Sequence, residues 1–113
     1  MKNFIHAKEA LSLLEVNSSK IRIKVREKNN TFKKIFNLSD SFIKDVIYSL
    51  EVKNFVRRLE NKDKNIKTKY LYEFETKLRL TDEYALKVLV DVYIKICFID
   101  DYTLVVSFHE KEF

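Results

Sequence analysis

The chain has 113 residues, which is enough for one small domain spanning residues 1–113. Apolar residues make up 46% of it, including nine Phe and six Tyr, and this composition excludes a disordered tail. Glycine and proline are both absent. Because phosphate-cradling loops need glycine for positive φ angles or close backbone approach, we expect no nucleotide cofactor.

A single cysteine is typical of a protein from a reducing compartment, and the distribution of apolar residues bears on targeting and membrane insertion. Cys97 is the one cysteine, so neither an intrachain disulfide nor a cysteine-based zinc site is expected. The first ten residues lack the apolar run of a signal peptide, and no stretch approaches the roughly 18 apolar residues of a membrane span. We therefore expect a cytoplasmic protein that does not contact a membrane.

The net charge of +5 is unevenly distributed along the chain. Residues 1–70 contain 17 Lys/Arg and 8 Asp/Glu, whereas residues 71–113 contain 5 and 9. The basic front half fits a phosphate-bearing partner such as nucleic acid, while the acidic remainder argues against uniform coating by a polyanion. The alternative interpretation is ordinary solvation of a lysine-rich chain.

Two helices and one strand are predicted in the first half, between turns at residues 17–19, 29–30 and 37–40 that are rich in Asn, Asp and Ser. Residues 20–26 alternate between apolar and basic side chains, which predicts a half-buried strand with a basic outer face. The first helix has an apolar stripe of Phe4, Ala7, Leu11 and Leu14. The second is capped by Ser39 and buries Phe42, Ile43, Val46, Ile47 and Leu50.

Four strands are predicted in the second half, over residues 52–59, 69–80, 86–98 and 102–108. In the last three, even-numbered positions are mostly apolar and odd-numbered positions mostly charged or polar. The predicted fold class is therefore α+β, with the order α-β-α-β-β-β-β. Two helices from the N-terminal half pack on one face of a mainly antiparallel, twisted sheet, and the other face is polar.

The register of the last hairpin decides which polar residues meet. Because both strands keep apolar residues at even positions, a two-residue loop at Asp100-Asp101 would pair mismatched faces. A three-residue loop is therefore expected, and it places His109 opposite either Asp91 or Tyr93.

A cluster of proton donors follows from that register. A phenol, an ammonium, a guanidinium and an imidazole can together bind a phosphodiester and move its protons. The alternative is a solvated strand surface, which is the usual place for such residues. The predicted cluster contains Tyr93, Lys95, Ser107 and His109 on neighbouring strands, with Arg57 or Arg58 joining the same face.

Other candidate chemistry is weaker. His6 and His109 fall on different elements, and no spaced set of metal ligands recurs, so no metal cofactor is expected. Glu73 and Glu75 share a strand face, where their alternation with basic residues indicates an exposed strand with ion pairs. Cys97 has no thiolate-activating neighbours in the sequence and is expected to be buried or inert.

The C-terminal residues resemble the MqsR family (motility quorum-sensing regulator toxins). The resemblance is carried by Asp-Val-Tyr-Ile-Lys-Ile at 91–96 and Leu-Val-Val-Ser-Phe-His-Glu-Lys-Glu-Phe at 104–113. Upstream, residues 47–50 with 54–57 look like that family's helix end and following strand, and residues 72–74 are similar to its aromatic–acidic motif. The likeness covers roughly residues 36–113. The glycines often found in the family's loops are absent here.

The resemblance implies a RelE-like fold and the toxin component of a type II toxin–antitoxin pair that cleaves mRNA without a metal. Tyr93, Lys95 and His109 fall on matching positions, and Arg57 falls where a basic residue is expected. The implied partners are mRNA and a cognate antitoxin protein. Glu73, from the aromatic–acidic motif, is an outside candidate.

The resulting hypothesis is an endoribonuclease in which the 2′-hydroxyl of RNA attacks the adjacent phosphate. Lys95 and Arg57 would stabilise the transition state, Tyr93 would position phosphate or relay a proton, and His109 would act as general acid or base. RNA binding is assigned to Lys53, Arg58, Ser107 and Glu73. The rival hypothesis is a non-enzymatic phage or plasmid inhibitor that acts on a partner protein through its basic face.

Overall fold

The computed structural model describes residues 2–17 and 20–112, so most of the predicted turn at 17–19 lies outside the described residues. The helical elements are α1 (Lys2–Val16), α2 (Glu27–Ile35), α3 (Asp40–Tyr48) and the short 3-10 helix η1 (Val52–Asn54). The strands are β1 (Ile21–Ile23), β2 (Phe55–Glu60), β3 (Tyr70–Thr81), β4 (Lys87–Ile99) and β5 (Tyr102–Glu110).

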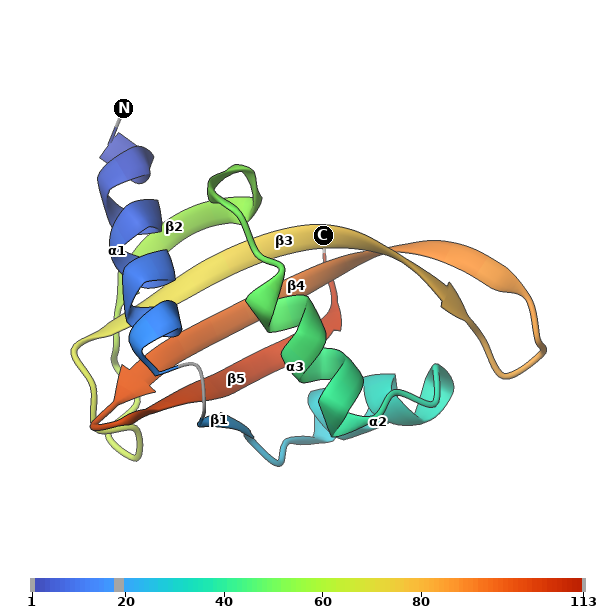
Figure 1. Cartoon of the computed structure of the whole chain (residues 1–113). Coiled ribbons are helices and arrows are strands. Elements are labelled where there is room, and N and C mark those ends of the chain that lie inside the picture. The colour runs from blue at the N-terminus through green and yellow to red at the C-terminus, as the bar shows by residue number, and fades with distance from the viewer. Residues whose placement is uncertain (1, 18–19, 113) are drawn as a thin grey trace.

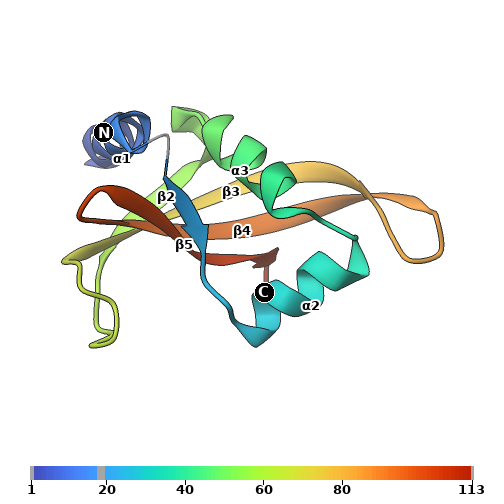
Figure 2. The same ribbon diagram turned by 60° about the horizontal axis from the view of Figure 1, so that its bottom comes forward.

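The strands form one mixed sheet in the order β1-β5-β4-β3-β2. Strands β2 to β5 pair antiparallel with their neighbours, and β1 pairs parallel with β5. Helices α1 and α3 lie across one face of this sheet, and α2 lies beside β5 (Figures 1 and 2). The α+β class and the mainly antiparallel sheet are therefore confirmed.

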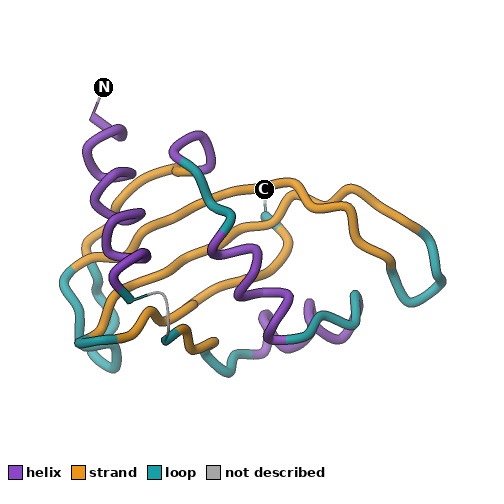
Figure 3. The backbone as a smooth tube through the Cα atoms, in the orientation of Figure 1, coloured by secondary structure: helices purple, strands orange, loops and turns teal. Residues whose placement is uncertain are grey.

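The main core lies between α1, α3 and the sheet. Ser39 caps α3 as predicted, because its hydroxyl accepts a hydrogen bond of 3.0 Å from the Phe42 N–H. The helix buries Ile43, Val46 and Ile47 against even-numbered residues of β3 and β4. Strands β3 and β4 are the longest, with 12 and 13 residues, and their hairpin extends beyond the helices (Figure 3).

The prediction of two helices and a turn at residues 29–30 is wrong, because α2 occupies this segment. Phe32 anchors the helix in the main core and packs against Phe36 and Phe108, with ring centroids 5.1 and 6.0 Å away. Asn29 is buried because its side chain bonds to the sheet rather than forming a turn. Consecutive Asn residues suggested a turn by local propensity, and tertiary packing overrides it.

The predicted strand at residues 20–26 is too long. Only Ile21–Ile23 pair with β5, opposite residues 103–105. The chain then turns away, Val25 is 82% exposed instead of facing inward, and Arg26 becomes the N-cap residue of α2. The alternation of side chains could not show that the pairing with β5 ends at Ile23, nor that a residue of α2 bonds to the rest of that edge of β5.

The loop of the last hairpin has two residues, not the three that the sequence predicted. Ile99 pairs with Tyr102, so Asp100-Asp101 is a two-residue turn. The face mismatch is resolved by a β-bulge: Ile96 pairs with Val105 and Lys95 with Ser107, leaving Val106 as the extra residue. As a result, His109 lies opposite Tyr93, which is one of the two predicted partners.

The face of the sheet away from α1 and α3 is not uniformly polar, contrary to the prediction. It carries a second apolar cluster of Ile66, Leu71, Cys97 and Val106, partly covered by the chain between β2 and β3. The bulge explains the position of Val106, since Val105 takes its predicted place in the main core. Cys97 is fully buried there, as expected, and burial raises the pKa of its thiol to about 11.

Candidate active site

Two rows of polar side chains cross the sheet on the face away from α1 and α3. Their members are opposite one another in the strand register, which brings them within side-chain reach. The first row runs from β2 to β5 through Arg57, Glu73, Lys95 and Ser107. The second contains Glu75, Tyr93 and His109 on β3, β4 and β5.

Glu73 holds two of the predicted site residues. Glu73 is 5% exposed, and its carboxylate accepts hydrogen bonds from the Arg57 Nε at 2.5 Å and from the Tyr93 hydroxyl. The Glu73 carboxylate raises the pKa of the Arg57 guanidinium. The pKa of Tyr93 is raised well above its usual range. Burial is the main cause, and the hydrogen bond to Glu73 is the second. The phenol is therefore neutral at physiological pH and serves as a hydrogen-bonding group.

His109 and Lys95 lie close to Tyr93, beside the ion pair of Arg57 and Glu73. The rings of Tyr93 and His109 are 5.5 Å apart between centroids, and the Lys95 Nζ is 5.8 Å from the Tyr93 centroid. The Tyr93 and His109 rings, Arg57 and Glu73 line a hollow of about 280 Å³, together with Val56, Glu75, Lys111 and Glu112. Four of the eight sequence-predicted site residues thus share one concave surface.

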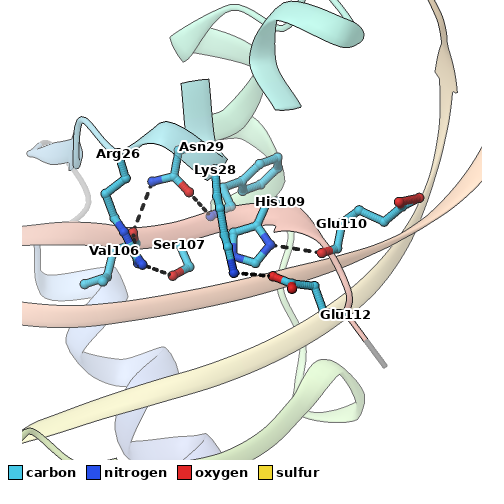
Figure 4. A network of polar contacts seen from close by, with 9 residues as sticks. Arg26, Lys28, Asn29, Val106, Ser107, His109, Glu110 and Glu112 are labelled. Atoms are coloured by element: carbon cyan, nitrogen blue, oxygen red, sulfur yellow. Dashed lines mark hydrogen bonds and ion pairs between the residues drawn. The ribbon is translucent and has the colours of Figure 1, made fainter. Parts of the chain in front are cut away.

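Ser107 belongs to the cluster in a different way. It is buried, and its hydroxyl accepts a hydrogen bond of 2.8 Å from the Arg26 Nη1, which also donates to the Val106 carbonyl at 3.2 Å (Figure 4). Asn29 lies beside it, with its amide bonded to the Val106 carbonyl and the Phe108 N–H. These contacts fix the bulged part of β5 that presents His109.

Arg58 and Lys53 lie elsewhere. Arg58 is on the helix side of the sheet, where it donates to Glu9 at 3.2 Å and stacks 3.7 Å from the Tyr70 centroid. Lys53 is on η1, 3.8 Å from Glu51. The structure therefore brings Arg57 into the cluster and leaves Arg58 and Lys53 outside it.

Sequence reasoning missed three residues of this surface as site residues. Arg26 was predicted only as part of a basic strand face, yet it reaches Ser107 from the start of α2. Lys111 lines the hollow and donates to Glu75 at 2.9 Å. Glu75 was predicted only as part of an exposed, ion-paired strand. The register Glu75–Tyr93–His109 could have indicated Glu75, whereas no signal in the sequence pointed to Arg26.

This surface combines ion pairs with groups that can exchange protons. Arg57 is paired with Glu73 and Lys111 with Glu75. Lys95 adds a third cation, Tyr93 a neutral hydroxyl and His109 an imidazole. Within residues 2–17 and 20–112, no three His, Cys, Asp or Glu side chains gather in a way that could hold a metal ion.

Comparisons with known proteins give no match: no family model, no curated protein and no solved structure matches the chain. Among the helices of the described segments, none combines the length and apolar character needed to cross a membrane.

Proposed function

We propose that the protein is an endoribonuclease that cleaves RNA without a metal ion, through attack of a 2′-hydroxyl on the adjacent phosphate. The observation that carries this proposal is the shared hollow of Arg57, Tyr93 and His109, with Lys95 beside the Tyr93 ring. Cationic side chains in this position can supply the positive charge that a metal supplies in other nucleases.

The proposed reaction is a balanced phosphoryl transfer. The 2′-oxygen forms a bond to phosphorus while the bond from phosphorus to the 5′-oxygen breaks. One proton leaves the 2′-hydroxyl and one reaches the 5′-oxygen, so the products are a 2′,3′-cyclic phosphate and a 5′-hydroxyl. His109 has the side-chain type that can give or take such a proton near neutral pH.

The other residues act on the phosphate. Arg57 and Lys95 stabilise the additional negative charge of the transition state. Tyr93 reaches a phosphate oxygen by exchanging its hydrogen bond to Glu73 for one to the phosphate, and its raised pKa argues against a role as the base. Glu73 is a positioning residue, since it holds both Arg57 and Tyr93 in place.

We further propose that the protein is the toxin of a type II toxin–antitoxin pair with a RelE-like fold, acting on mRNA in the cytoplasm. The support is the MqsR-like spacing of Tyr93, Lys95 and His109, whose strands pair so that Tyr93 faces His109. An antitoxin that covers this polar face would block the hollow. The basic front half of the chain suits an RNA partner.

Two experiments test this function. Induced expression should arrest bacterial growth and deplete mRNA, and a co-expressed antitoxin should relieve the arrest. Purified protein should cut RNA in excess EDTA but not DNA, nor RNA carrying a 2′-O-methyl group at the cut site. Cutting of DNA, or complete loss of activity on chelation, would contradict the mechanism. Soluble protein without growth arrest or RNA cleavage would favour the non-enzymatic inhibitor.

A further inference from the structure

A second hollow, of about 580 Å³, lies between α2 and the C-terminal end of β5. His109 and Glu112 line both this hollow and the proposed active site, so the two are adjacent. Its volume is within the usual range of small-molecule sites, about 300–1,000 Å³. A ligand bound here would contact the same imidazole that faces Tyr93.

The wall contributed by α2 is apolar. Phe32 and Phe36 line it with their rings edge to face at a centroid distance of 5.1 Å, and Ile35 adds a partly exposed aliphatic side chain. Phe32 is buried in the main core, so the accessible apolar surface comes mainly from Phe36 and Ile35. Surfaces of this kind hold a nucleobase by apolar contact.

The rim of the hollow carries three carboxylates and one ammonium group. Glu27, Glu110 and Glu112 are exposed and line the hollow, and Lys28 forms an ion pair of 2.5 Å with Glu112 next to His109 (Figure 4). Carboxylates accept hydrogen bonds from the exocyclic amino groups of bases.

We propose that this hollow is a nucleobase subsite that binds the base next to the scissile phosphate. The carboxylate rim favours adenine, guanine and cytosine over uracil, which has no exocyclic amino group. This inference rests on the proposed ribonuclease function and assigns a source of its sequence preference. The cations around Arg57 bind the phosphate, and the apolar wall of α2 binds the base attached to it.

Binding measured without cleavage tests the subsite. The probes are the 3′- and 5′-monophosphates of adenosine, cytidine, guanosine and uridine, with inorganic phosphate as reference, in calorimetric titrations. Thr31→Leu places a larger side chain in the hollow, whereas Asn30→Leu, its exposed neighbour outside the lining, is the matched control. Both changes favour helix, so α2 is retained, and circular dichroism and melting check this.

Thr31→Leu should weaken nucleotide binding about tenfold, a loss comparable to that of one stacked base, while binding of inorganic phosphate stays unchanged. Asn30→Leu should bind like the wild type. Glu27→Gln with Glu110→Gln should reduce the preference for amino-bearing bases over uracil. Nucleotides that bind no more tightly than inorganic phosphate would overturn the subsite, as would equal affinities of Thr31→Leu and Asn30→Leu.

RNA cleavage, measured on the same preparations, separates this inference from the proposed function. Wild-type protein that binds nucleotides in a Thr31-dependent way but does not cut RNA would support the subsite and contradict the ribonuclease. Wild-type protein that cuts RNA, with Thr31→Leu unchanged in base preference and nucleotide affinity, would support the ribonuclease and overturn the subsite.

Discussion

The rings of Tyr93 and His109 face each other across β4 and β5, with their centroids 5.5 Å apart. This relationship depends on the β-bulge at Val106. If the register of the Asp100-Asp101 turn continued without the bulge, Phe108 would lie opposite Tyr93, and His109 would be one position out of register. The extra residue therefore places an imidazole on the polar face while Phe108 stays in the core.

Replacing His109 with alanine should lower RNA cleavage by about 10²–10⁴-fold, because a general acid or base is lost. The side chain is partly exposed, so the free energy of unfolding should change by no more than about 0.5 kcal/mol. The measurements are cleavage rates and urea unfolding of the same preparation. An active variant with a lowered melting temperature would instead make His109 a structural residue.

Ile94→Ala is the control for that experiment. Ile94 lies between Tyr93 and Lys95 but is fully buried in the main core. Its truncation should cost about 2–5 kcal/mol of stability through the cavity left behind. Any loss of cleavage in this variant should follow the unfolded fraction and recover when the temperature is lowered.

The raised pKa of Tyr93 predicts a loss of stability at high pH. Burial and the Glu73 carboxylate disfavour the ionised phenol in the folded protein, whereas an unfolded tyrosine ionises near pH 10. The contribution to the free energy of unfolding is therefore fully present below about pH 10 and falls as the pH rises beyond it. Tyr93→Phe should lose less stability than the wild type between about pH 10 and 11. Parallel losses in denaturant titrations would contradict this assignment.

Hydrophobic periodicity predicted the three long strands and α3 to within a few residues, because burial of one face imposes a period on the sequence. It also predicted that Tyr93, Lys95, Ser107 and His109 would share a face. It could not place Arg58, whose neighbour Arg57 entered the cluster instead. The bulge between Phe55 and Arg57 interrupts the simple alternation of β2.

The missed features all depend on contacts between distant segments. The Asn29 side chain bonds to a strand 77 residues further along the chain, so α2 has no local signal strong enough to replace the predicted turn. The bulge at Val106 likewise reconciles a two-residue turn with the packing of the core, and neither constraint is visible in β5 alone. Contacts between segments far apart in the sequence therefore determine the local structure at Asn29 and Val106.

The lowered pKa of Glu9 predicts acid sensitivity of the α1 contact. Glu9 accepts a 2.7 Å bond from the Tyr72 hydroxyl, which is the main cause of the shift, and Arg58 adds a second bond. The stabilisation is present above the unfolded pKa of about 4.3 and is lost as the pH falls toward the lower folded value. Glu9→Gln should flatten the decline in melting temperature between about pH 5 and 3. Glu15→Gln, exposed on the same helix, should decline like the wild type.

The buried Asn29 amide should be essential for the end of β5. Its Nδ2 donates to the Val106 and Lys24 carbonyls at 3.1 and 3.0 Å, and its Oδ1 accepts from the Phe108 N–H at 2.9 Å. These bonds continue the edge pairing of β5 after β1 has ended. Asn29→Ala should therefore cost roughly 1–3 kcal/mol for each buried backbone group that is left without a partner.

The matched control for this last change is the neighbouring Asn30→Ala, which alters an exposed position of the same helix and should stay within about 0.5 kcal/mol of the wild type. Urea unfolding gives both values. Because the released backbone includes the residue before His109, Asn29→Ala should also lower the cleavage rate of the fraction that remains folded. Equal stabilities of the two variants would show that water replaces the Asn29 amide at the β5 edge without cost.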